Sequence, residues 1–189
     1  MKHLIKVAIP VLAVILFAAC NSQEAGKSET TTDTVAHEGH DHSSMSESSA
    51  PAAAAVQLKD DRLNAVYQHY VHLTTALING DEAEAKMASN AIEAGAAAVS
   101  DGKALGASAA KITAAADIEA QRTAYADLSS NFISLVKKSG MNSGALYIDF
   151  CPMAMNDKGA YWISANKEVK NPYFGEKMMT CGEVKETIE

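Results

Sequence analysis

The sequence has little positive charge, few cysteines and no long apolar run. Its 16 Lys and Arg are outnumbered by 23 Asp and Glu, the formal net charge is −7, and the basic residues form no stripe. Nucleic-acid binding is therefore not expected, because contact with phosphates needs a basic surface. The apolar stretch at residues 7–17 is too short for a permanent transmembrane helix, which takes about 20 residues.

Motifs that would carry catalysis or bind an organic cofactor are also missing. No nucleophile has a base at a recognisable spacing, neither G-x-S-x-G nor H-E-x-x-H occurs, and no glycine-rich phosphate loop follows a strand. Serines, threonines and aspartates are abundant, but they lie in linker or helix-cap contexts. We therefore expect a protein that is not an enzyme and has no organic cofactor.

The first 20 residues predict a signal peptide followed by a lipid-modified cysteine. A charged start and the apolar stretch lead to Ala18-Ala19-Cys20, which resembles the lipobox of bacterial lipoproteins, although Phe17 replaces the usual Leu, Val or Ile. We expect cleavage after residue 19 and acylation of Cys20, which would attach the protein stably to the membrane. A soluble secreted protein with an incidental cysteine is the alternative. Asn21 follows the lipidated cysteine, where an aspartate would retain a lipoprotein in the inner membrane. We therefore expect the protein to be anchored in the outer membrane, facing the periplasm.

Residues 20–56 lack apolar periodicity and predict a disordered tether that precedes a folded domain at residues 57–189. A His-rich tract in this tether places His37, His40 and His42 close together along the chain. Imidazoles on a flexible chain can converge on Zn, Cu or Ni, so these residues are accessory metal-ligand candidates. A polar linker that happens to contain histidines explains the same pattern, and both interpretations stay open.

Apolar residues at three- and four-residue steps predict four helices with short connections, hence a mainly α fold built on an up-and-down four-helix bundle. The expected helices lie near residues 58–79, 81–101, 105–116 and 117–138. Asp81 and Glu84 have the spacing of a capping box at the start of the second helix. On the first helix, His69 and His72 lie off the apolar stripe and are expected at the surface.

After residue 140 the sequence becomes β-like. The runs "ALYIDF" at 145–150 and "AYWIS" at 160–164 are joined across a turn sequence at 156–159, which predicts a small hairpin. Residues 176–189 are compatible with either a strand or a loop. A hairpin alone is marginally stable in water, so this C-terminal segment must pack on the bundle or be cross-linked to itself.

Two cysteines remain besides Cys20, and both lie among methionines. Met153 follows Cys151 by two residues, while Met178 and Met179 precede Cys181. Thiolates and thioethers are soft ligands that favour Cu(I), and residues i and i+2 of an extended chain point to the same side. A Cys151–Cys181 disulfide surrounded by methionines that fill the core explains the same residues. Residue types alone leave a metal site and a disulfide open as alternatives.

These motifs resemble those of a known family. "CPMA" at 151–154, "GAYWIS" at 159–164 and "NPYFGEKMMTCGEV" at 171–184 are similar to the C-terminal signature of DUF3347, a domain of unknown function. The segments "YVHLTTALINGD" at 70–81 and "DIEAQRTAYADLSSNFISLVKK" at 117–138 resemble its helices, so the resemblance extends over residues 58–189. The family occurs in bacterial envelope lipoproteins and in CusB-type heavy-metal efflux adaptors.

The resemblance implies that the sulfur residues handle a soft metal ion, with Cu(I) as the expected ion. The implied ligands are Cys151, Met153, Met178 and Cys181, and Met179 is an accessory candidate because the family often has leucine there. "CPM" is followed here by Ala154-Met155 instead of the usual histidine and proline, which argues against zinc. The expected function is to sequester the ion or transfer it to a heavy-metal efflux adaptor. The alternative is a metal-free interaction domain that is cross-linked by the cysteines and docks to an efflux or envelope partner.

Overall fold

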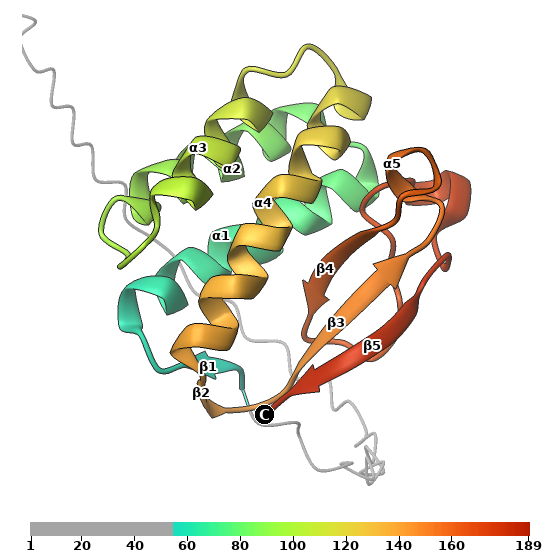
Figure 1. Cartoon of the computed structure of the whole chain (residues 1–189). Helices are drawn as coiled ribbons and strands as arrows, with labels where there is room; N and C mark the ends of the chain where they lie inside the picture. The colour runs from blue at the N-terminus through green and yellow to red at the C-terminus, as the bar shows by residue number, and fades with distance from the viewer. Residues whose placement is uncertain (1–54) are drawn as a thin grey trace, which may run out of the picture. The chain divides into compact units, whose positions relative to one another are not determined.

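The computed structural model of the chain describes residues 55–189, and four helices follow one another in its first part. They are α1 (Asp61–Asn79), α2 (Glu82–Ala96), α3 (Lys103–Thr113) and α4 (Ile118–Ser139), and each packs on the next (Figure 1). The predicted mainly α fold is confirmed. The helix predicted from residue 58 starts three residues later, because Leu58 belongs to the short strand β1 (Gln57–Leu58), which pairs with β2 (Met141–Ser143).

Aspartates begin three of these helices. The Asp60 carboxylate accepts the N–H groups of Arg62 and Leu63 at the start of α1, and the Asp117 carboxylate accepts the N–H of Ala120 at the start of α4. Asp81 accepts hydrogen bonds from the N–H groups of Ala83 and Glu84, so the predicted start of α2 is confirmed. The reciprocal half of the capping box is absent, because the Asp81 N–H donates to the carbonyl of Ala76 instead.

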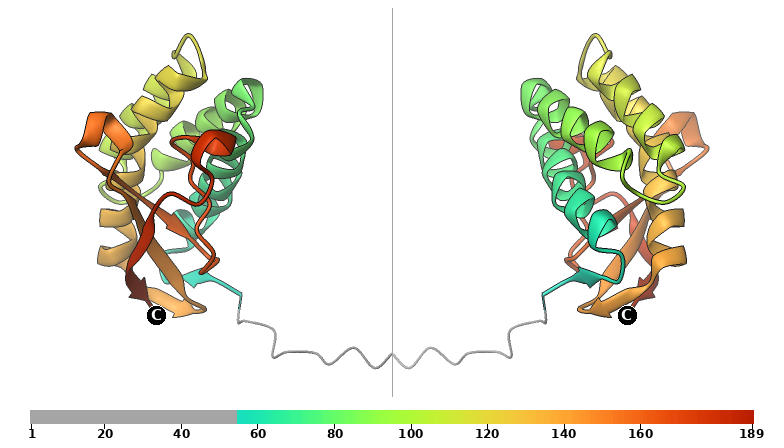
Figure 2. Two further views of the ribbon diagram at one scale, coloured as in Figure 1. Left: turned by 90° about the vertical axis from the view of Figure 1, so that its right-hand side faces the viewer. Right: turned by 90° about the vertical axis from the view of Figure 1, so that its left-hand side faces the viewer.

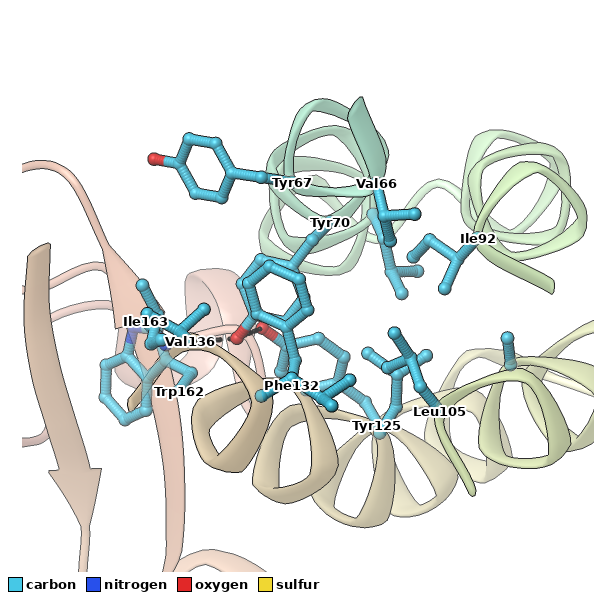
Figure 3. Close-up of a cluster of buried hydrophobic side chains, with 14 of the residues drawn as sticks. Val66, Tyr67, Tyr70, Ile92, Leu105, Tyr125, Phe132, Val136, Trp162 and Ile163 are labelled. Carbon is cyan, nitrogen blue, oxygen red and sulfur yellow. Dashed lines mark hydrogen bonds between the residues drawn. The ribbon is translucent and has the colours of Figure 1, made fainter. Parts of the chain in front are cut away.

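Stacked aromatic rings join α1 to α4 in the core (Figure 3). The ring centroids of Tyr70 and Phe132 are 4.3 Å apart, and Tyr125 also stacks on Tyr70, with the centroids 5.8 Å apart. The buried Tyr70 hydroxyl contacts Ser129 Oγ at 2.7 Å and accepts the N–H of Ile163 at 3.0 Å. This hydroxyl therefore connects the helices to the C-terminal sheet and is itself satisfied.

The C-terminal sheet has three antiparallel strands in the order β4-β3-β5. The predicted hairpin is confirmed as β3 (Leu146–Cys151) paired with β4 (Ala160–Ser164), and the last residues form the third strand, β5 (Glu183–Ile188). Two short helical segments lie between the strands, α5 (Ala154–Asp157) and η1 (Gly175–Met178).

The sheet packs against the bundle through β4, which contacts α4, while η1 contacts α1. Figure 2 shows this from two sides, with the strands beside α4 and the η1 segment reaching toward α1. Among residues 55–189, no helix combines the length and the apolar character needed to cross a bilayer. The predicted signal peptide and all but the last two residues of the predicted tether lie outside the described residues.

Candidate functional site

The two cysteines of the folded part meet at one end of the sheet. β3 ends at Cys151, and β5 begins two residues after Cys181. β3 and β5 are antiparallel, and Phe150 pairs with Glu183. The end of β3 and the start of β5 therefore lie at the same end of the sheet. The two Sγ atoms lie 3.3 Å apart, and both thiols are free. Cys151 is fully buried and Cys181 is partly exposed, and we refer to the two residues as the thiol pair.

Gly182 permits this close approach. Its φ of 143° lies in a region that side chains rarely adopt. A Cβ at this position would lie 2.9 Å from the Trp162 ring and 3.1 Å from the carbonyl oxygen of Phe150. A larger residue would therefore push the chain away from β3 and separate Cys181 from Cys151.

Asn171 holds the chain that leads into Cys181. Its Nδ2 donates to the Cys181 carbonyl at 2.7 Å, and its backbone N–H donates to the Met179 carbonyl at 2.8 Å. Its Oδ1 accepts the N–H of Tyr173 at 2.8 Å. Since Asn171 is completely buried, water does not compete for these bonds, and the loop is held as one unit.

The distance within the thiol pair suits two kinds of chemistry. It exceeds the roughly 2.05 Å of a disulfide, and it is about 0.5 Å shorter than the spacing of two sulfurs that bind one tetrahedral ion at about 2.3 Å each. The hydrogen bond with Cys151, and then burial, raise the pKa of the Cys181 thiol. Cys181 therefore keeps its proton in neutral water until a metal ion displaces it or an oxidant removes it.

The methionines predicted as ligands lie in different places. Met153 is in a turn beyond the end of β3, with helical backbone angles, and is 45% exposed. The extended geometry predicted to turn Cys151 and Met153 to one side is therefore wrong, because the strand stops at Cys151. Met178 ends η1, and its carbonyl accepts the Cys181 N–H at 3.1 Å. Met179 lines a separate cavity of about 400 Å³.

Asp149 is a residue near the thiols that the sequence interpretation missed. It lies on β3 opposite Trp162, two residues before Cys151, and it is fully buried. Neither carboxyl oxygen has a hydrogen-bond partner among the residues that the structure describes. Burial raises the pKa of this carboxyl to about 7. The available signal is a single acidic residue inside an otherwise apolar strand run.

The predicted histidines contribute no described ligand to the thiol pair. His69 and His72 are exposed on α1, as predicted, and His72 Nε2 pairs with Glu84 Oε2 at 2.7 Å. The tether histidines His37, His40 and His42 and the predicted lipidation residue Cys20 lie outside the described part of the chain. Within residues 55–189, no three side chains of His, Cys, Asp or Glu come close enough to hold a metal ion. A third protein ligand from this region would thus be a thioether or a backbone group.

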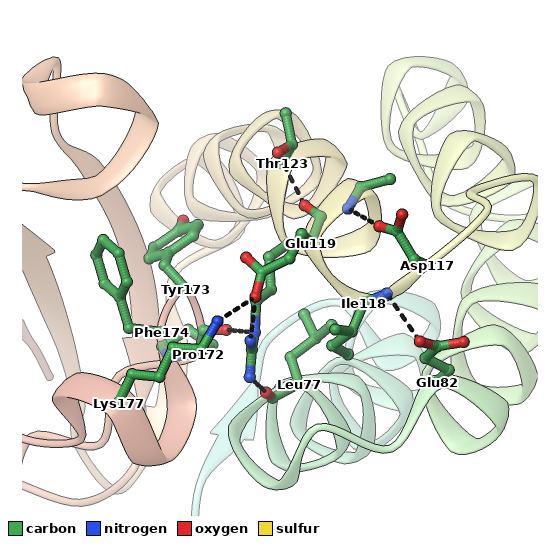
Figure 4. A network of polar contacts seen from close by, with 12 residues as sticks. Leu77, Glu82, Asp117, Ile118, Glu119, Thr123, Pro172, Tyr173, Phe174 and Lys177 are labelled. Carbon is green, nitrogen blue, oxygen red and sulfur yellow. Dashed lines mark hydrogen bonds and ion pairs between the residues drawn. The ribbon is translucent and has the colours of Figure 1, made fainter.

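Arg122 ties the loop that carries Cys181 to the helices, and the sequence interpretation did not single it out. It is buried on α4, where Nη2 donates to the Leu77 carbonyl at 2.8 Å and Nε to the Pro172 carbonyl at 3.2 Å. Glu119 accepts hydrogen bonds from both Arg122 and Lys177 (Figure 4). The loop between β4 and β5 is therefore anchored on α1 and α4 together.

Part of the chain matches the model of a known protein family. Residues 66–144 match the model of DUF3347, described as a protein of unknown function, which confirms the resemblance over this range. The match runs from within α1 to just past β2, so both cysteines and the C-terminal motifs lie beyond it. No curated protein and no solved structure matches the chain.

Proposed function

We propose that this protein, which matches DUF3347 over residues 66–144, binds a soft metal ion, with Cu(I) as the preferred ion, at the thiol pair. The observation that supports this most strongly is the 3.3 Å separation of the two Sγ atoms at the end of a buried strand pair. Both sulfurs can bind one ion after a shift of about 0.5 Å. Because thiolates are soft ligands, the pair favours Cu(I) over Mg, Ca and Mn.

Met178 is the third ligand that we propose. Its carbonyl accepts the Cys181 N–H, so one tight turn holds both residues. Two thiolates and a thioether form a soft ligand set without the imidazoles that complete many zinc sites. Met153 lies exposed beyond the strand, and we propose no direct role for it in this inner set.

We further propose that the protein acts in the cell envelope, anchored to the outer membrane through Cys20. The tether at residues 20–56, with His37, His40 and His42, would act as a capture arm that raises the local ion concentration near the membrane. The site would then either sequester Cu(I) or hand it to a heavy-metal efflux adaptor. Support for this part comes from the N-terminal sequence and from the resemblance to envelope lipoproteins and efflux adaptors.

Competitive titration tests the metal site. The full chain, reduced and kept in detergent, is titrated with Cu(I) against a chelator of known affinity. We expect one ion at the thiol pair and a loss of roughly a thousandfold or more in affinity for Cys151→Ser/Cys181→Ser, which removes two strong ligands. Met87→Leu alters an exposed methionine on α2 and should leave the affinity unchanged. Unchanged affinity in the double-serine variant would remove the site from these residues.

The sulfur distance also supports a second candidate function, a metal-free domain that docks to an efflux or envelope partner and is held by a Cys151–Cys181 disulfide. A closure of about 1.3 Å would form the bond once a thiol oxidant of the envelope accepts the two electrons and the two thiol protons leave. It would span 30 residues and stabilise the fold by about 3–4 kcal/mol in the chain-entropy model. Intact mass after alkylation of protein taken from the periplasm separates the candidates. A two-hydrogen deficit without alkylation supports the disulfide, and two alkylated cysteines support the thiol form.

A further inference from the structure

A second pair of sulfur-bearing side chains lies outside the thiol pair. Met153 and Met155 both line a cavity of about 540 Å³ that is also lined by Tyr173 and by residues of α4. Met153 is among the four large apolar side chains that are exposed in the described part of the chain, and Met155 is partly buried. Thioethers are soft ligands, and the cavity is lined by two methionines, one of them exposed, at a surface that an incoming ion can reach.

The backbone that carries Met155 adopts an unfavourable conformation. Met155, Asn156 and Asp157 have φ values of 55°, 54° and 63°, so three residues in succession are left-handed. Residues with a side chain rarely adopt this conformation, and asparagine and aspartate tolerate it better than methionine does. Such strain persists where the surroundings enforce it, often at binding sites. Here it accompanies the placement of Met155 in the same cavity as Met153.

The cavity lies next to the buried member of the thiol pair. Met153 follows Cys151 by two residues, across the end of β3. Tyr173 also lines the cavity, and its hydroxyl donates to the carbonyl of Tyr161, which follows the residue paired with Cys151 on β4. Cys151 is completely buried, so an ion reaches this thiol from a neighbouring surface, and the cavity provides one such surface besides the partly exposed Cys181.

The charges that line the cavity are mixed. Glu119 and Asp157 contribute carboxylates, while Arg122 and Lys158 contribute cations, and Arg122 is paired with Glu119. The lining therefore has no excess of positive charge that would repel a monovalent cation. Thioethers carry no proton that must leave, so ion binding there does not require the deprotonation that thiols need.

We propose that Met153 and Met155 form an outer site for a soft monovalent cation, from which the ion passes to the thiol pair. Transfer breaks the ion's bonds to the two thioether sulfurs and forms bonds to the two thiol sulfurs. The ion keeps its single positive charge, and the two thiol protons are released to water. The transfer role rests on the proposed function, whereas the outer site itself does not.

Ag(I) is the probe for the outer site, because it is soft, monovalent and stable in air. The full chain in detergent carries ¹³C-labelled methionine methyl groups, and its thiols are blocked either by Cys151→Ser/Cys181→Ser or by oxidation of the unmodified chain. We expect one equivalent of Ag(I) to shift the Met153 and Met155 methyl signals together, while the exposed Met87 signal stays in place. Met153→Leu should weaken this binding by roughly tenfold or more, since one of two ligands is lost.

The transfer role is measured in the chain with free thiols. Met153→Leu/Met155→Leu keeps the side-chain volume nearly constant, so the fold and the final occupancy of the thiol pair should be unchanged. Absorbance from silver-bound thiolates should rise several-fold more slowly than in the unmodified chain. Shifts at Met87 equal to those at Met153, or none at either cavity methionine, overturn the outer site. Shifted signals with an unchanged loading rate overturn the transfer role. If the unmodified chain binds no more silver than the Cys151→Ser/Cys181→Ser variant, only the proposed function is overturned.

Discussion

The helices and the C-terminal sheet differ in what they leave unsatisfied. In the helices, the buried oxygens without a partner belong to the uncharged side chains of Ser89 and Gln121, whereas the sheet buries both unpaired oxygens of Asp149. The sheet end also holds two free thiols in contact and a left-handed methionine. Regular packing therefore dominates the bundle, while features that cost free energy gather around the thiol pair.

The comparison with the family model follows the same division. The matched residues, 66–144, contain most of the four helices, and the thiol pair lies beyond them. The bundle thus provides a scaffold, and its contacts through Tyr70 and Arg122 determine where the sheet lies. Variants that act on one region should reveal how strongly it depends on the other.

The largest expected effect is a loss of stability as the pH rises, which arises in the sheet alone. The Asp149 pKa is about 7 in the folded protein against an ordinary value of 3.8. The folded state therefore binds this proton more tightly than the unfolded state does, and the contribution is fully present below about pH 4. It is lost as the pH rises through 7, by up to about 4 kcal/mol. Urea unfolding of the reduced, metal-free protein between pH 4 and 8 measures this change.

Asp149→Asn isolates this contribution from those of other carboxyls. Lys138 holds the pKa of Asp101 low, and Lys177 does the same for Glu119, so both carboxyls act in the opposite direction at acid pH and remain in the variant. The asparagine variant should lose the decline between pH 4 and 7. An identical decline in both proteins would show that Asp149 is not the group responsible.

The next effect should appear when the link between the two regions is cut. Arg122→Ala removes the donor of the buried Pro172 carbonyl and one of the two donors of the Leu77 carbonyl, so we expect the free energy of unfolding to fall by about 3 kcal/mol. Fluorescence of Trp162, the only tryptophan, reports on the sheet during urea unfolding. Lys111→Ala, which breaks only the exposed pair with Asp127, is the control, with an expected change below about 0.5 kcal/mol. Equal effects for the two variants would contradict the anchoring role.

The helices were predictable because their signal is local. Side chains such as Leu63, Tyr70 and Leu77 recur at helical spacing, and all three are buried, so the period alone identifies the inner face. The capping residues also allowed the helix starts to be predicted. The misplaced half of the capping box shows the limit of this approach, because a carbonyl from the preceding helix took the Asp81 N–H.

The candidate site was predictable only as a set of residue types. The clustering of cysteine and methionine indicated soft-metal chemistry, but the 3.3 Å contact depends on the register of β3 and β5 and on the small size of Gly182. These are relations between residues distant in sequence. The side on which Met153 lies was mispredicted because the end of β3 was not known. Asp149 and Arg122 are polar residues whose burial is decided by tertiary packing.

A smaller effect is expected from the loop that carries Cys181. Asn171→Ala removes three side-chain hydrogen bonds in a buried position and should cost about 2 kcal/mol. Cys181 should also react faster with maleimide, because its carbonyl is no longer held. Asn166→Ala, at an exposed position in the same loop, should change neither quantity noticeably. A lower free energy of unfolding without any change in Cys181 reactivity would mean that Asn171 stabilises the loop but does not position the thiol.

The smallest effects test a helix start in the bundle, where local rules should hold best. Asp81→Ala removes the acceptor for two N–H groups and should lower the free energy of unfolding by about 1 kcal/mol. Glu84→Ala should cost less than about 0.5 kcal/mol, because this carboxylate makes only an exposed pair with His72 and the Asp81 N–H already has a carbonyl acceptor. Both values come from urea unfolding. Equal costs for the two variants would mean that Glu84 caps the helix in solution after all, and that the local pattern prevails over the contact with α1.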